Sequence, residues 1–125
     1  MSRHRVSKPG DKRLYEMHAQ VCKVLANAKR LEVINLLRDG ETTAGELVVS
    51  MGISKANVSQ QLAVMREKGI LTARREGRNV YYRLAYPGML KAYDMLRRVL
   101  LDQLRDTAAL SKRWHGVRSH QGGGR

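Results

Sequence analysis

The sequence predicts a mainly α-helical domain with one small β-hairpin, and two patterns support that prediction. Up to Gly69 the apolar residues mostly recur every three or four positions, which is the spacing of one face of a helix. Beyond it, Val80, Tyr82 and Leu84 alternate with their neighbours, which is the pattern of a strand. Two of the helices are separated only by a tight turn and lead into a basic hairpin. The fold predicted is therefore a winged helix-turn-helix.

Composition indicates one domain with a polyanionic partner. The chain has 125 residues, 42% of them hydrophobic, and a formal net charge of +13. Residues 54–84 hold seven Lys and Arg against two Glu, so the charge excess of the ordered part lies on the second half of the helix-turn-helix and the hairpin. We expect a flexible basic arm over 1–10, a DNA-binding and dimerisation domain over 11–110, and a flexible basic Gly-rich tail over 111–125.

Several protein classes are not expected. No apolar run approaches the roughly 18 residues of a membrane span, and the basic N-terminus lacks the apolar segment of a signal peptide. The single cysteine, Cys22, excludes an internal disulfide framework and fits a reducing cytoplasm. No spacing ties a nucleophile to a base, so we expect neither an enzyme nor a cofactor.

The first two helices are predicted over 11–26 and 28–39. Asp11 and Asn27 can cap them, and Gly40 suits the position that ends the second. The apolar stripe of the first helix is Leu14, Met17, Val21, Val24 and Leu25. The expected buried stripe of the second helix is Leu31, Ile34 and Leu37, with Val33 and Leu36 alongside.

The helix-turn-helix is predicted from Thr43 to Lys68. Thr43 and Glu46 can form a capping box at the start of its first helix. Gly52 ends this helix, and Ser54 caps the second one. The core stripe of that second helix is Val58, Leu62 and Met65. Its opposite face carries mostly short or flexible hydrogen-bonding side chains: Lys55, Asn57, Ser59 and Gln60, with Gln61 nearby. Asn and Gln can pair bidentately with adenine, so this face favours DNA reading.

A basic hairpin over 71–84 follows, with its tip at residues 76–79. Pro87 and Gly88 separate it from a last helix over 89–110. A hairpin this small cannot cover the apolar stripe of such a helix. The spare apolar surfaces of the first and last helices therefore predict a homodimer through these two helices.

These features together predict an interface for double-stranded DNA. The second helix of the helix-turn-helix would supply base and groove-edge contacts, while the hairpin would contact backbone or minor groove. The residues that we expect to contact DNA are Ser54, Lys55, Asn57, Ser59, Gln60, Gln61, Arg66, Lys68, Arg74, Arg75, Arg78 and Asn79.

Several motifs in this order resemble the ArsR/SmtB family of winged helix-turn-helix repressors. The segments that carry the resemblance are 25–31, 40–47, 53–62, 69–71, 74–78 and 80–84. The resemblance implies a cytoplasmic transcription factor of a bacterium or archaeon, homodimeric through its first and last helices. It also implies repression of a promoter until an effector weakens DNA binding.

The sensing sites best known in that family are not encoded at their usual places. Val48 and Ser50 occupy the positions of the Cys-x-Cys that senses arsenic, lead or cadmium. The first cysteine of the persulfide sensors is replaced by Asn35. The positions of the zinc and cobalt ligands hold Tyr86, Gly88, Val99 and Asp102. The resemblance therefore leaves the effector open.

Cys22 and His18 are the candidate sensing residues. They lie four residues apart on the first predicted helix and so share a face. Cys22 could be a small buried residue at an interface, an oxidisable or persulfidated thiol, or, with His18 and a second subunit, part of a soft-metal site. The histidines of the terminal segments, His4, His115 and His120, are most simply solvated side chains.

The function predicted is that of a sequence-specific DNA-binding transcriptional regulator, an effector-released repressor that lacks the usual metal sites of the family. Two alternatives stay open. One is a sequence-tolerant DNA-coating protein that binds mainly through its basic tails. The other is a protein-interaction module that has kept the fold and lost DNA reading.

Overall fold

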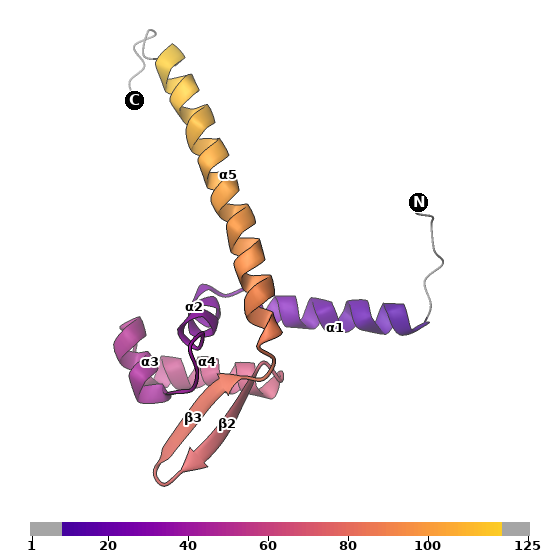
Figure 1. Ribbon diagram of the computed structural model, residues 1–125, viewed down its shortest axis with the longest axis vertical. Helices are drawn as coiled ribbons and strands as arrows, with labels where there is room; N and C mark the ends of the chain where they lie inside the picture. Colours follow the sequence, from indigo (N-terminus) through magenta and orange to yellow (C-terminus); the bar gives the residue numbers. More distant parts are fainter. Residues whose placement is uncertain (1–8, 119–125) are drawn as a thin grey trace. The chain divides into compact units, whose positions relative to one another are not determined.

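The computed structural model describes the backbone of residues 9–118 and the side chains of residues 10–109. Outside this range lie residues 1–8 of the predicted arm, which include His4, and the side chains of His115 and His120. The elements are α1 (Pro9–Leu25), α2 (Ala28–Leu36), β1 (Thr42–Thr43), α3 (Ala44–Met51), α4 (Lys55–Glu67), β2 (Leu71–Glu76), β3 (Asn79–Leu84) and α5 (Gly88–Arg118) (Figure 1). They form two units, which divide between Pro87 and Gly88.

The predicted N-caps at Asn27, Thr43 and Ser54 are confirmed. Two predicted helix ends are wrong: α1 begins at Pro9, so that Asp11 lies inside its first turn, and α2 ends at Leu36, before Gly40. The Asn27 side chain accepts hydrogen bonds from the backbone N–H groups of Lys29 and Arg30, at 2.9 and 3.2 Å. Thr43 Oγ1 accepts from the Glu46 N–H at 3.2 Å, and Glu46 Oε1 accepts from the Thr43 N–H at 2.9 Å, which completes the capping box. The hydroxyl of Thr42 also donates to Glu46, and these hydrogen bonds lower the pKa of the Glu46 carboxyl. The start of α3 is therefore fixed locally.

The turn between α3 and α4 is short and sharply defined. Gly52 adopts a left-handed conformation with φ of 69°, and its N–H donates to the carbonyl of Val48 at 2.9 Å. Ser54 Oγ then accepts from the Asn57 N–H at 3.1 Å, which caps α4. The helix-turn-helix predicted from the sequence is thus present between residues 43 and 68.

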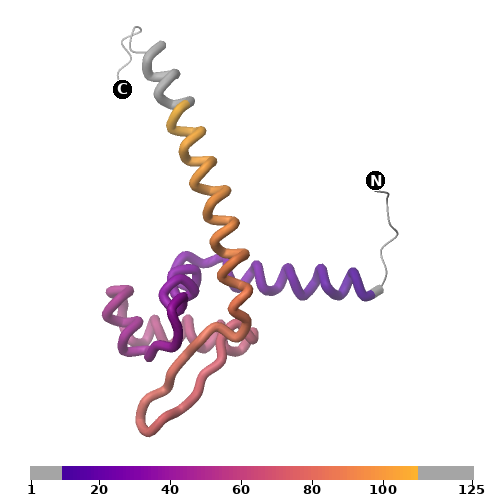
Figure 2. The backbone as a smooth tube through the Cα atoms, viewed as in Figure 1, coloured from indigo at the N-terminus to yellow at the C-terminus, as the bar shows by residue number. Residues whose placement is uncertain are grey.

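The hairpin belongs to a three-stranded antiparallel sheet with strand order β1-β3-β2. Strands β2 and β3 pair from Leu71 opposite Leu84 to Glu76 opposite Asn79, so the tip consists of residues 77 and 78. The two-residue strand β1 pairs with β3 on its other side and was not predicted. Figure 2 shows the hairpin projecting past the cluster of α2, α3 and α4.

The core lies among α2, α3, α4 and the base of the hairpin. Its buried apolar residues are Val24, Val33, Ile34, Leu37, Leu47, Val58, Leu62, Met65, Ile70, Leu71 and Leu84. One predicted member is wrong: Leu31 is 36% exposed, whereas Val33 is completely buried. Apolar residues occupy most positions of α2, so spacing alone could not show which of its faces meets α4.

The second unit is the helix α5, which continues to Arg118 instead of ending at the predicted residue 110. Its large apolar side chains are exposed in the single chain: Met95, Leu96, Val99, Leu100, Leu101 and Leu104. In the first unit, α1 likewise exposes Leu14, Tyr15 and Met17. Among the described residues, none of the helices combines the length and apolar character that crossing a bilayer would require.

Candidate nucleic-acid interface

Helix α4 has one buried face and one polar exposed face. Val58, Leu62 and Met65 point into the core, as predicted. The exposed side chains of α4 and its C-cap include Lys55, Ser59, Gln60, Arg66 and Lys68, while Asn57 is half-buried. Most of the helix residues that we predicted to contact DNA therefore lie together on the accessible side of α4.

Gln61 is the exception, and its placement corrects the prediction. Its side chain belongs to the buried face and is only 8% exposed. The carboxamide oxygen accepts a hydrogen bond from Arg30 Nε at 2.9 Å, and the amide nitrogen donates to Asn57 Oδ1 at 2.9 Å. Because both ends of the amide are occupied inside the protein, Gln61 supports α4 and is not part of its exposed face.

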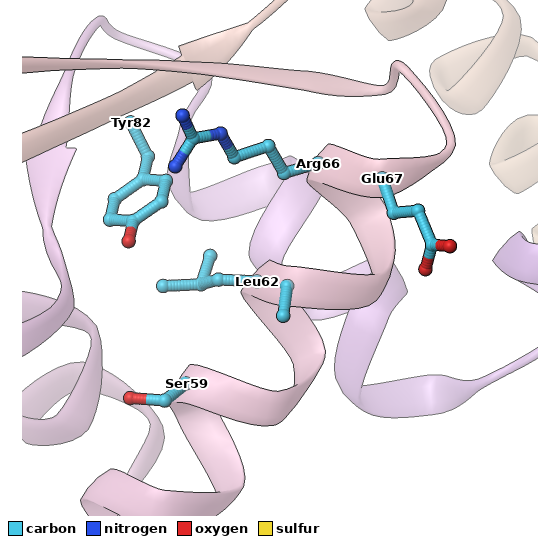
Figure 3. Close-up of a pocket in the computed structure, with 6 residues that line it drawn as sticks. Ser59, Leu62, Arg66, Glu67 and Tyr82 are labelled. Atoms are coloured by element: carbon cyan, nitrogen blue, oxygen red, sulfur yellow. The ribbon is translucent and has the colours of Figure 1, made fainter.

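A shallow hollow of about 400 Å³ lies between α4 and β3 (Figure 3). Its polar lining residues are Ser59, Arg66, Glu67 and Tyr82. In Figure 3 the carboxylate of Glu67 points away from the other three side chains. Hydroxyl and guanidinium groups are common ligands of DNA phosphates. Tyr82 was not among the predicted site residues, because the alternation of Val80, Tyr82 and Leu84 indicated only a strand.

Arg74, a predicted contact residue on the hairpin, is paired within the protein. Its guanidinium pairs with both carboxylate oxygens of Glu41 at 2.7 and 2.8 Å, and with Glu76 at 2.7 Å. It also lies over the ring of Tyr81, 4.8 Å from the centroid. These contacts tie β2 to the segment before β1. The Arg74 charge is thus already balanced within the protein, while half of its side chain remains exposed.

The Arg74 pairing also sets the protonation of its main partner. The hydrogen bonds and charge of Arg74 lower the pKa of the Glu41 carboxyl, and Arg83 adds to the effect. A carboxyl whose pKa is lower in the folded protein stabilises the fold above its unfolded-state pKa. That contribution is lost as the pH falls through the lowered pKa.

The remaining hairpin cations are more accessible. Arg75, Arg78 and Arg83 are exposed, and within the described residues none of these three forms an ion pair with a carboxylate. Arg78 is at the tip beside Gly77, whose φ of 64° allows the tight two-residue connection. Asn79 is exposed at the start of β3. The tip therefore presents the exposed cation of Arg78 next to the amide of Asn79.

Cys22 and His18, the candidate sensing residues, are both exposed on α1 in the single chain. Within the part of the chain whose side chains are described, no three His, Cys, Asp or Glu residues are grouped as a metal site would need. The sensing roles of both residues stay predictions.

Comparison with known proteins places this arrangement among bacterial regulators. The family described as "Bacterial regulatory protein, arsR family" matches residues 27–73. The HTH-type transcriptional regulator Rv0081 of Mycobacterium tuberculosis, itself described as uncharacterized, is 36% identical over 98 residues, or 78% of this chain and 86% of that protein. Its crystal structure matches with a TM-score of 0.69 and 34% identity over 82% of this chain and 99% of that chain.

Two further solved structures are similar. The transcriptional repressor BigR from Xylella fastidiosa matches with a TM-score of 0.66 and 30% identity, over 75% of this chain and 96% of that chain. The homodimeric winged helix-turn-helix DNA-binding domain Mb0332 from Mycobacterium bovis matches with a TM-score of 0.71 and 27% identity, over 82% of this chain and 95% of that chain.

Proposed function

Because this chain belongs to the arsR family of bacterial regulatory proteins, we propose that it is a homodimeric, sequence-specific DNA-binding regulator that represses transcription. One observation carries the proposal. The exposed face of α4 presents hydrogen-bonding side chains beside a hollow bordered by hydroxyl and guanidinium groups. A helix of this kind can enter the major groove while the adjoining hairpin contacts the sugar-phosphate backbone.

The contacts divide by chemistry. We assign base and groove-edge contacts to the N-terminal half of α4, through Lys55, Asn57, Ser59 and Gln60, with Ser54 at its cap. We assign phosphate contacts to Arg66 and Lys68, which follow on the same helix and its C-cap. The hairpin contributes Arg75, Arg78 and Asn79 to backbone or minor groove. Gln61 and Arg74 are withdrawn from the set, because their polar groups are engaged within the protein.

Dimerisation is proposed through the first and last helices. Both expose large apolar side chains in the single chain, at Leu14 and Met17 on α1 and at Leu96 and Leu100 on α5, for example. Exposed apolar surface of this extent is typical of a subunit interface. A twofold axis would set the two α4 helices about 34 Å apart, or one turn of DNA, and so favour a palindromic operator.

The accessible and the internally paired arginines of the hairpin allow a matched test. We expect Arg78→Ala to make the slope of log affinity against log salt shallower by about 0.9 per subunit, because one phosphate contact and its counterion release are lost. Arg74→Ala should leave that slope nearly unchanged, because the Arg74 guanidinium is already neutralised by Glu41 and Glu76. Fluorescence anisotropy with one duplex across a series of salt concentrations measures both slopes.

Two outcomes would count against the assignment. Equal changes of slope in the two variants would show that Arg74 also contacts DNA and that its internal pairing breaks on binding. Absence of DNA binding by the wild-type protein, even at low salt, would favour the protein-interaction module over a DNA-binding regulator.

A further inference from the structure

A chain of three hydrogen bonds connects the end of α1 to the DNA-facing side of α4. Arg30, in the first turn of α2, donates from Nη1 to the carbonyl oxygen of Val24 at 2.8 Å and from Nε to Gln61 Oε1 at 2.9 Å. Gln61 Nε2 in turn donates to Asn57 Oδ1 at 2.9 Å. The chain thus begins at a cation and ends at a residue that we assign to DNA contact.

The direction of every hydrogen bond in this chain is fixed by arginine chemistry. A guanidinium has only donors, so Gln61 must turn its oxygen toward Arg30. Its amide nitrogen then faces Asn57, and a buried amide requires a partner at each end. Asn57 must therefore turn its oxygen inward. What Asn57 can still offer outside the chain is its amide nitrogen, with two N–H donors.

The two contacts of the Arg30 guanidinium keep the hydrogen-bond directions in this chain from reversing. Val24 lies in the last turn of α1, where backbone carbonyls have no partner within the helix. By donating to that carbonyl as well as to Gln61, the guanidinium is held at two points. A side chain held in this way cannot swing away and release the Gln61 amide without leaving both acceptors unsatisfied.

We propose that Arg30 is a positioning residue that sets Asn57 to read hydrogen-bond acceptors in the major groove. This inference rests on the proposed function. In the major groove guanine presents only acceptors, O6 and N7, and thymine presents the acceptor O4. Cytosine presents the N4 donor, and adenine presents the N6 donor beside the acceptor N7. A bidentate pair with adenine requires both the oxygen and the nitrogen of the asparagine at the base edge. Because Oδ1 is turned toward Gln61, the adenine pairing expected from residue type is disfavoured.

Gln61→Glu is the decisive variant, because it alters a buried residue and leaves Asn57 unchanged. A glutamate at this position keeps the contact with Arg30 as an ion pair but has no donor for Asn57. Asn57 should then turn its amide nitrogen inward and present its oxygen to the groove. At one base pair of each half-site, the preference should change from guanine or thymine to cytosine or adenine, with a shift of about tenfold in relative affinity.

The test uses full-length protein and a duplex selected by the wild-type protein from a randomised library. Competition against every single-base-pair variant of that duplex gives a ranking at each position. Arg30→Lys is the matched control, since lysine is also a donor only and should keep the wild-type ranking. If Gln61→Glu does not fold, Asn57→Asp decides. Its carboxylate accepts from Gln61 and presents a second acceptor outward, so the same change toward cytosine or adenine is expected.

The outcomes distinguish a failure of this inference from a failure of the proposed function on which it rests. A wild-type protein that selects an operator, together with unchanged rankings in Gln61→Glu, overturns the inference alone. If Gln61→Glu does not fold, an unchanged ranking of the duplexes by Asn57→Asp likewise overturns the inference alone. Loss of affinity to the same degree on every duplex also overturns it, because Asn57 would then contact phosphate. A wild-type protein that selects no sequence overturns both the inference and the proposed function.

Discussion

Leu47→Ala is expected to lower the free energy of unfolding by about 2–5 kcal/mol, the usual cost of truncating a buried leucine. Leu47 is 1% exposed and is the buried residue of α3. This helix packs against α2, α4 and the sheet, so the cavity would open where the helix-turn-helix meets the rest of the core. Urea unfolding at a fixed protein concentration measures this change in free energy. The two proteins can be compared when the m value, the slope of unfolding free energy against urea concentration, is the same for both.

Val49→Ala is the matched control on the same helix. Val49 is 83% exposed, so its truncation removes almost no buried surface and should change stability by less than about 0.5 kcal/mol. Similar losses in the two variants would mean that α3 does not pack through Leu47, or that Val49 is covered in the dimer. Running both variants at several protein concentrations separates these two explanations, because only an interface effect depends on concentration.

Gln60→Ala is expected to weaken binding to a selected operator by about 1–3 kcal/mol, with little change on random DNA. Gln60 is exposed on α4. Gln61 is hydrogen-bonded to Arg30 and Asn57, whereas the described part of the structure shows no such internal partner for Gln60. Its amide is thus available to a base edge. Anisotropy titrations with the operator and with a random duplex of equal length give both affinities.

Gln103→Ala provides the control for Gln60→Ala. Gln103 is an exposed glutamine on α5, outside the α4 face, and its truncation should change neither affinity. An equal loss on operator and random DNA for Gln60→Ala would assign Gln60 to a phosphate contact and remove it from the base-reading set.

The comparison of sequence and structure shows which features are encoded locally. The cap of α3 was predictable because Thr43 and Glu46 are three residues apart and satisfy each other within one turn. The polar face of α4 was predictable because helical spacing separates it from Val58, Leu62 and Met65. Features of this kind depend on residues within a turn of one another.

The features that were missed depend on partners distant in the sequence. Gln61 looked like a DNA-reading residue because its partner Arg30 is 31 positions away. Arg74 was predicted to contact the DNA backbone or minor groove, and its pairing with Glu41 was not foreseen because Glu41 is 33 positions away. A polar side chain at the edge of a helix face has the same appearance in the sequence whether it meets solvent, DNA or a buried donor. Only the packing of α2 against α4, and of the hairpin against the segment before β1, decides between these environments.

The ratio of affinities for selected and random DNA tests the central claim most directly. The wild-type protein would first select duplexes from a randomised library, and its affinity for the enriched sequence would then be compared with a random duplex at the same salt concentration. A sequence-specific regulator predicts a ratio on the order of a thousand or more. A ratio near one would contradict sequence reading by α4 and favour a protein that coats DNA without regard to sequence.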